Sequence, residues 1–184
     1  MADYYLISQL PALDGIGESA PLPITEERFL ELCNRFLGKK TLHSIEDITL
    51  LPPQDPEKKS AGLIAAWNEG ERTLRIALAK IRAEKMNKPF DCKSQALPPE
   101  LIKVAKAATE LENPLEAEGF LLKHRLSFLE DLRPINGFSE DYLFYYGIKL
   151  KLLLRLRELD ATVGKAEYRK LYNSILNGDQ PEEI

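Results

Sequence analysis

The segment YLFYYGIKLKLLLRLREL, residues 142–159, constrains the fold of this chain more than any other part of its sequence. Placed on a helical wheel, it is apolar over roughly two-thirds of its circumference. Its polar side chains fall on a narrow face made by Lys151, Arg155 and Glu158. A helix with so little polar surface is normally buried between several neighbours. We therefore predict that this segment is a central core helix that other helices surround.

Apolar residues at three- and four-residue steps predict further helices along most of the chain. Caps and breakers mark their ends: Thr25 and Ser139 as N-caps, the pair Asn113-Pro114 at a helix start, and Gly38 at a helix end. The expected helices cover residues 26–37, 42–51, 57–86, 98–109, 115–132 and 166–176 in addition to the core helix. The longest of them contains Gly70, and a glycine inside a helix costs about 1 kcal/mol of stability relative to alanine. The helix therefore either continues through residues 68–70 or kinks there.

The chain opens with MADYYLISQLP, in which aromatic and β-branched residues follow one another up to Pro11. This composition predicts a short strand or extended strap that anchors itself against the helices. Asp3 stands where a secretory signal would carry a basic residue, so we expect no signal peptide. We also expect no membrane span, because no run of 18 uncharged apolar residues occurs.

Together these features predict an all-α fold: an antiparallel helical bundle with one or two long helices and a short N-terminal strand or strap. The length of 184 residues fits one helical domain. A division into two lobes stays open, in which residues 1–56 and 98–184 form the lobes and residues 57–88 form a long connecting helix.

Charge is distributed unevenly along the chain, although the net charge is only −4. Residues 1–56 contain four Lys/Arg and nine Asp/Glu, whereas residues 57–88 contain eight and four. The acidic total argues against a nucleic-acid binder. Within the basic segment, Arg72, Arg75 and Arg82 lie largely off the apolar stripe and are expected to be accessible to solvent. They form either a merely solvated helix face or a contact surface for an acidic partner.

The tyrosines of the core helix provide a second candidate contact surface. A partly solvent-exposed face would suit Tyr142, Tyr145 and Tyr146, because the tyrosine ring is apolar while its hydroxyl can stay hydrated. The competing interpretation is that all three rings belong to the core.

No motif in the sequence selects a catalytic, cofactor-binding or metal site. The loop from Gly15 to Ala20 matches G-x-G-x-x-A, but Pro21 and Pro23 prevent the helix that a dinucleotide site needs. The stretch from Gly38 to Thr41 resembles the end of a P-loop, but the leading glycine is missing and a helix precedes it. We therefore expect no catalytic residues, no cofactor and no metal.

The sequence contains few histidines and cysteines, and none of them occurs at a spacing typical of metal ligands. His43 and Glu46 form a single reversed copy of a di-iron motif that requires two, and His124 has no partner at such a spacing. Cys33 falls on an apolar stripe, and Cys92 forms no C-x-x-C pair with it. This cysteine usage fits a reducing cytosol.

Three stretches of the sequence carry a family resemblance: residues 4–11, YYLISQLP; Phe29, Leu30 and Cys33 in the first predicted helix; and Tyr142, Tyr146, Leu150, the Arg-rich tract to Asp160 and Gly164 at the end. Together they resemble a bacterial family that is encoded among the subunits of V-type (V/A-type) ATPases. The family is similar in helical style to the funnel-shaped helical subunit that couples the central stalk of these ATPases to the membrane ring. This chain has about half the length expected for that coupling subunit.

The resemblance implies a non-catalytic subunit or an accessory or assembly protein of a V-type ATPase, with a reduced form of the coupling subunit as one possibility. Its partners would be ATPase subunits on the stalk or membrane-ring side, and its location cytoplasmic, peripheral at the inner membrane through the complex. Two alternatives stay open. One is a small helical enzyme whose site is assembled from distant residues, and the other is an unrelated helical adaptor.

Overall fold

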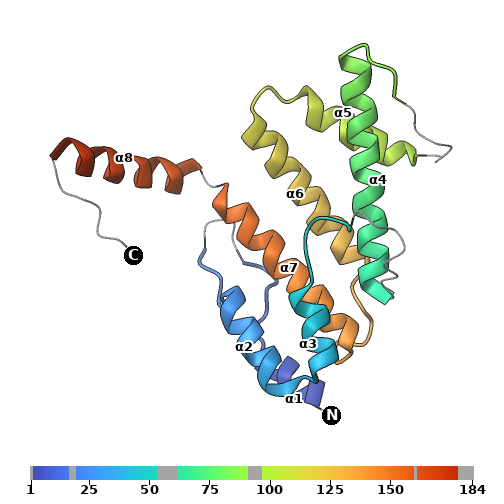
Figure 1. Cartoon of the computed structure of the whole chain (residues 1–184), viewed down its shortest axis with the longest axis vertical. Coiled ribbons are helices and arrows are strands. Elements are labelled where there is room, and N and C mark those ends of the chain that lie inside the picture. The colour runs from blue at the N-terminus through green and yellow to red at the C-terminus, as the bar shows by residue number, and fades with distance from the viewer. Residues whose placement is uncertain (1, 17–19, 54–61, 91–96, 160, 178–184) are drawn as a thin grey trace.

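All the regular structure in the described part of the chain is helical, which confirms the all-α prediction. The computed structural model describes residues 2–16, 20–53, 62–90, 97–159 and 161–177. The helices, shown in Figure 1, are α1 (Ala2–Gln9), α2 (Glu26–Phe36), α3 (Lys39–Glu46), α4 (Gly62–Lys85), α5 (Pro99–Glu110), α6 (Pro114–Asp131), α7 (Glu140–Glu158) and α8 (Ala161–Asn177).

Three of these helices begin at the side-chain caps that the sequence predicts. Thr25 Oγ1 accepts a hydrogen bond from the backbone N–H of Arg28 at 3.2 Å, at the start of α2. Asn113 and Ser139 accept equivalent bonds at the starts of α6 and α7. Each cap satisfies a backbone donor that has no partner inside its helix, so these boundaries are set by local chemistry.

The N-terminal segment is a helix, so the prediction of a strand or extended strap is wrong. Leu6 and Ile7 are adjacent and both buried, which a half-buried strand does not allow because its neighbouring side chains face opposite ways. On α1 they share one face, and Leu10 follows one turn later against the same core. The expected anchoring is confirmed, because α1 packs against α2 and Tyr146 donates its hydroxyl hydrogen to the Pro11 carbonyl at 2.9 Å.

Two further boundaries differ from the prediction. The sequence predicts the second short helix at 42–51, but α3 begins three residues earlier after Gly38 and ends before Asp47. It also predicts that the last helix begins at residue 166, yet α8 begins at Ala161 and Gly164 lies inside it. The first residues of the predicted long helix, 57–61, lie outside the described part, and α4 continues through Gly70 without interruption.

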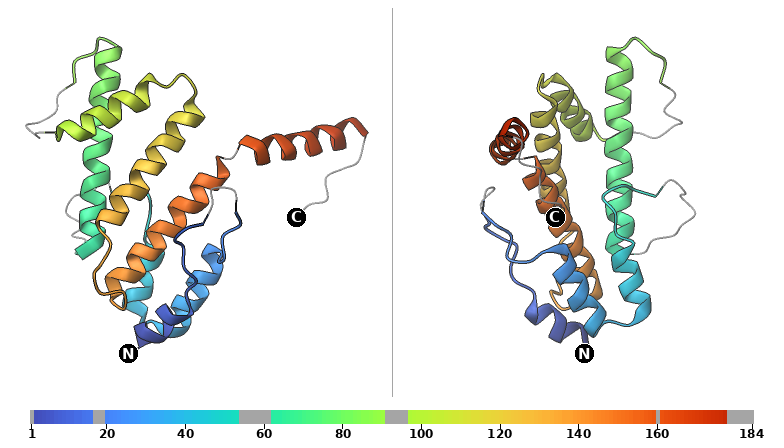
Figure 2. Two further views of the ribbon diagram at one scale, coloured as in Figure 1. Left: turned by 180° about the vertical axis from the view of Figure 1, so that it is seen from behind. Right: turned by 60° about the vertical axis from the view of Figure 1, so that its left-hand side comes forward.

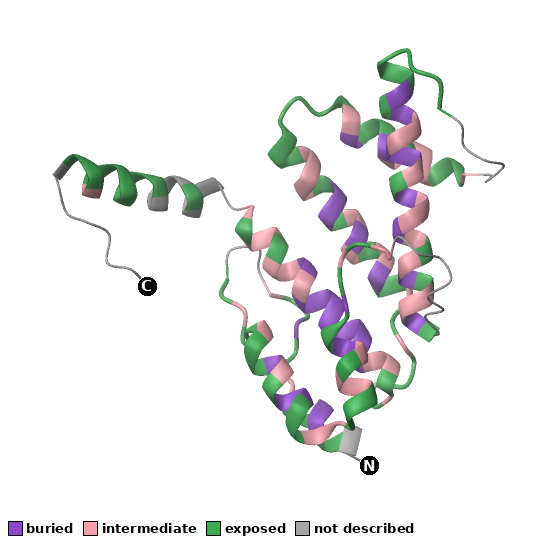
Figure 3. Ribbon diagram, in the orientation of Figure 1, coloured by how far each residue is buried: buried purple, intermediate pink, exposed green. Residues whose placement is uncertain are grey.

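Helix α7 occupies the centre of the molecule, as its apolar sequence predicts. It packs against α2, α3, α4 and α6, and every residue from 143 to 150 is buried. Figure 3 shows this buried stretch between the surrounding helices. The main core forms around it from side chains of α1, α2, α3, α6 and the first turns of α4.

A second, smaller core lies farther along α4. It contains Leu74, Ala77, Leu78 and Ile81 of α4, Ala105 and Ala108 of α5, and Leu121 of α6. Helices α4 and α6 contribute to both cores and therefore connect them. Helix α5, which the two-lobe alternative groups with the following residues up to 184, contributes its buried side chains to the second core.

Helix α8 points away from the other helices in the views of Figures 1 and 2. Of its described side chains, only that of Ser174 is partly covered, and the others are exposed. The helix therefore takes little part in either core.

Candidate interaction surfaces

The three arginines singled out on α4 differ in their surroundings. Arg75 and Arg82 are exposed as expected, whereas Arg72 is half-buried. Arg72 Nη1 lies 2.8 Å from Glu69 Oε2, and Arg75 Nε lies 3.6 Å from Glu71 Oε2. Arg82 forms no ion pair with any residue that the structure describes. The three side chains are therefore not an equivalent basic face, and Arg82 is the one whose charge is least compensated.

Arg75 borders a buried ion pair that sequence reasoning did not predict. Glu71 on α4 is 2% exposed, and its Oε1 accepts a hydrogen bond from Arg125 Nε of α6 at 2.8 Å. Its second oxygen, Oε2, accepts no hydrogen bond from any residue in the described ranges. Reversing Arg75 to Glu would place a second carboxylate against Glu71, and a buried charge without compensation is strongly destabilising. The reversal of Arg75 is therefore unsuitable as a test of docking.

The tyrosines of α7 are mostly core residues, which corrects the alternative of an open tyrosine face. Tyr145 and Tyr146 are 1% and 2% exposed, and only Tyr142 is partly accessible. The Tyr145 hydroxyl donates to Glu130 Oε1 at 2.7 Å. Burial raises the pKa of Tyr145 to about 12 and also raises the pKa of Tyr146. Both rings stay neutral and serve packing in this fold.

Lys149 is a charged group buried within the main core. Its ammonium donates to Asp14 in the loop after α1 and to Glu130 on α6, and it donates to the Tyr145 hydroxyl at 3.0 Å. Burial alone would lower the pKa of Lys149, but these hydrogen bonds outweigh burial and raise it. The hydrogen bond from Lys149 is likewise the main cause that lowers the pKa of Asp14. The hydrogen bonds of Lys149 therefore connect α7 with α6 and with the loop after α1.

The residues considered for catalysis lie on different elements. His43 on α3 pairs with Asp47 at 3.6 Å at the surface. Cys33 is fully buried on α2, and burial raises its pKa to about 12, so its thiol is neutral at physiological pH. Cys92 lies outside the described residues. Among the residues that the structure describes, no group of three or more His, Cys, Asp and Glu side chains could hold a metal ion.

His124 lines a small cavity of about 280 Å³ beside the buried Glu71–Arg125 pair. Burial lowers its pKa, and the nearby Arg125 reinforces this while Glu71 opposes it. Asp131 also lines the cavity, but neither His43 nor Cys33 does. The groups that would have to converge for a site assembled from distant residues are therefore not brought together in this cavity.

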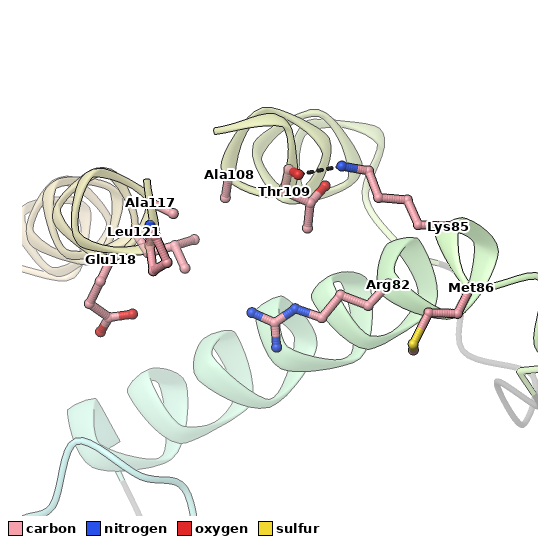
Figure 4. A pocket seen from close by; sticks show the side chains of 9 residues that line it. Arg82, Lys85, Met86, Ala108, Thr109, Ala117, Glu118 and Leu121 are labelled. Atoms are coloured by element: carbon pink, nitrogen blue, oxygen red, sulfur yellow. Dashed lines mark hydrogen bonds between the residues drawn. The ribbon is translucent and has the colours of Figure 1, made fainter. Parts of the chain in front are cut away.

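A larger cleft of about 520 Å³ lies where the ends of α4 and α5 meet the start of α6 (Figure 4). Its polar lining comes from Arg82, Lys85, Thr109 and Glu118, and its apolar lining from Met86, Ala108, Pro114, Ala117 and Leu121. Of this set, sequence reasoning singled out only Arg82 as a candidate contact residue. The other lining residues come from three helices, and no local spacing predicts their meeting.

The second surface that sequence reasoning missed is the apolar stripe of α8. Four of its residues follow one another at steps of three, one and three, which places them on one helical face: Tyr168, Leu171, Tyr172 and Ile175. Their exposed fractions lie between 52% and 74%, and the two tyrosine rings stack with centroids 6.1 Å apart. Figure 3 shows α8 as the most continuously exposed helix. The spacing is visible in the sequence, but it is also typical of a helix that packs into its own core.

None of the helices in the described ranges combines the length and apolarity that crossing a bilayer requires. Comparison of the chain with protein-family models, with curated proteins and with solved structures finds no significant match.

Proposed function

We propose that this protein is a non-catalytic adaptor that binds a larger assembly through α8, and that the assembly is a V-type ATPase. The observation that carries the docking part is the exposed apolar stripe on a helix that projects from two already formed cores. The ATPase part rests on the resemblance of the opening, α2 and closing segments to a family encoded with ATPase subunits.

The stripe has the properties of a helix that inserts into a groove of another protein. Tyr168, Leu171, Tyr172 and Ile175 supply anchors at the spacing that such complexes use. Tyrosine is enriched in the centres of interfaces because its ring is apolar while its hydroxyl tolerates water. Contiguous apolar surface on a monomeric protein usually marks a binding site rather than a solvated face.

Two roles fit this proposal. The protein is either a stoichiometric stalk component, such as a reduced counterpart of the subunit that couples stalk and membrane ring, or a factor that holds subunits during assembly. Both roles place it in the cytoplasm, peripheral at the inner membrane through the complex. Neither requires chemistry from the chain itself, in line with the buried neutral Cys33 and the solvent-exposed His43.

The proposal is tested by co-purification with the ATP-hydrolysing subunits of the ATPase from the native host. Leu171→Glu combined with Ile175→Glu places two carboxylates in the stripe, and we expect the complex to be lost. The matched control is Asn173→Glu with Ser174→Glu, which adds the same charge outside the stripe on the same helix. We expect the control to co-purify like the wild type.

Different failures contradict different parts of the proposal. Wild-type protein that never travels with ATPase subunits under gentle conditions, and a locus without such subunits, would remove the ATPase assignment. Equal co-purification of the stripe variant and the control would instead remove α8 as the docking element while leaving the assignment in place.

A further inference from the structure

We propose that the cleft between the ends of α4 and α5 and the start of α6 binds a small organic monocarboxylate with an apolar tail. This site is independent of α8 and of the proposed ATPase partner. Its volume of about 520 Å³ falls in the range of small-molecule sites, which combine an apolar lining with a few polar groups that orient the ligand.

Two cations, Arg82 and Lys85, line the cleft, and neither forms an ion pair with a residue that the structure describes. Lys85 donates its ammonium hydrogen to the Thr109 carbonyl at the end of α5. Glu118 Oε1 lies 3.6 Å from Arg125 Nη1, so its charge is partly balanced from behind the cleft. Arg82 has no ion pair among the described residues, and Figure 4 shows its side chain extending from α4 toward the wall that α6 forms. The cleft therefore favours an anion at Arg82.

The chemistry of Arg82 favours a carboxylate. A guanidinium presents parallel N–H donors that match the two oxygens of a carboxylate. The lining contains two cations, Arg82 and Lys85, and one carboxylate, Glu118, so one added negative charge balances its surplus. A dianion such as phosphate would keep a surplus charge near Glu118, so the site suits a monoanion.

The rest of the lining suits the apolar tail of such a ligand. Ala108 and Leu121 are buried residues of the second core, and Met86 and Ala117 continue this apolar surface to either side. Alanine at 108 and 117 keeps the side chains of α5 and α6 short where they face the cleft. A methionine at the edge adapts to different tail shapes because its chain is unbranched and flexible.

The two methionines of the chain provide a direct probe of this site. Met86 lines the cleft, and Met1 is the only other methionine, so a protein labelled with ¹³C at the methionine methyl groups gives two signals. Met86→Leu assigns them. We expect hexanoate to shift the Met86 signal saturably while the Met1 signal stays in place. 1-Hexanol, with the same chain length and no charge, should bind at least about tenfold more weakly, because it loses the charged hydrogen bonds.

Variants locate the anion at Arg82. Arg82→Gln should weaken hexanoate binding by about tenfold or more, and Arg82→Lys, which keeps the charge but not the paired donors, should weaken it less. Arg72→Gln on the same helix is the control and should leave the affinity unchanged. The proposal is overturned if hexanoate does not shift Met86, if hexanoate and hexanol bind equally, or if Arg82→Gln binds hexanoate like the wild type.

Discussion

At the scale of single residues, Gly70 shows how a locally unfavourable choice serves the packing of helices. A glycine inside a helix costs about 1 kcal/mol relative to alanine. A Cβ at this position would clash with both Cε1 and Cζ of Phe128 on α6. The Phe128 ring stacks in turn on Trp67, with centroids 6.1 Å apart. The missing side chain therefore lets α6 bring an aromatic ring against α4.

Replacing Gly70 by alanine should destabilise the protein despite the better helix propensity of alanine. We expect a net loss of about 1–3 kcal/mol in the free energy of unfolding, because the Phe128 ring must shift within a packed core. Gly119→Ala is the matched control, since Gly119 lies inside α6 and a Cβ there would have nothing within 4 Å. The control should gain up to about 1 kcal/mol. Urea unfolding measures both, and equal gains would contradict the packing role of Gly70.

This residue also marks where sequence reasoning ends. The cost of Gly70 was predictable from helix propensity, but its cause was not, because Phe128 lies 58 positions away. The caps at Thr25, Asn113 and Ser139 were predictable, because a cap and its donor are at most three residues apart. Reasoning from spacing therefore succeeds for contacts within one turn and fails for contacts between helices.

At the scale of elements, α7 combines an apolar surface with one buried ammonium group that joins it to two other segments. Lys149 reaches Glu130 on α6 and Asp14 in the loop after α1. Arg133 also approaches Asp14, with Nη1 and Oδ2 3.4 Å apart. The ion pairs hold that loop, and through it α1, against the central helix.

The ion pairs predict how acid affects stability. The pKa of Asp14 in the folded protein is lowered below its ordinary value of 3.8, mainly by its hydrogen bond with Lys149. Asp14 therefore stabilises the fold above pH 3.8, and this contribution is lost as the pH falls through the lower folded pKa. Asp14→Asn should be less stable than wild type near neutral pH, and the difference should shrink as the pH falls below 3.8.

Urea unfolding at a series of pH values measures this difference. Asp131→Asn is the control, because Asp131 is an exposed carboxylate that is not part of these ion pairs. The stability difference between the control and the wild type should change less than that of Asp14→Asn over the same interval. A difference for Asp14→Asn that stays constant down to the acid limit would contradict the role of Lys149 as its partner.

The same network explains which elements were predictable. Residues 142–159 predict the core helix and its central place, because burial of a long apolar segment leaves few alternatives. The segment does not reveal which of its polar residues is buried, because the partner Asp14 lies 135 residues away. The prediction of a strand at the N-terminus was wrong for a related reason. Aromatic and β-branched residues favour strands only where a neighbouring strand pairs with them, and this fold offers α2 instead.

At the scale of the whole molecule, the helices divide into a packed body and one projecting helix. The main core and the second core share α4 and α6, so the body from α1 to α7 is continuous. Helix α8 follows α7 closely in the chain, yet the large apolar side chains that the structure describes on it, from Tyr168 to Leu176, are exposed. The sequence could not separate these two cases, because an apolar stripe looks the same whether it meets its own core or a partner.

Removal of α8 should therefore leave the body folded. We expect the free energy of unfolding of a chain that ends at Leu159 to lie within about 1 kcal/mol of that of the full-length protein, because exposed segments contribute little to stability. Deletion of residues 1–12 is the contrasting variant. It removes the buried Leu6 and Ile7 and the Pro11 carbonyl that accepts a hydrogen bond from Tyr146, so it should destabilise the protein by several kcal/mol.

Thermal unfolding followed by circular dichroism compares the three proteins. If the chain without α8 proved as unstable as the chain without α1, the stripe of α8 would have to cover part of the protein's own body in solution. The docking role of α8 would then lose its basis, since its apolar residues would already be satisfied within one chain.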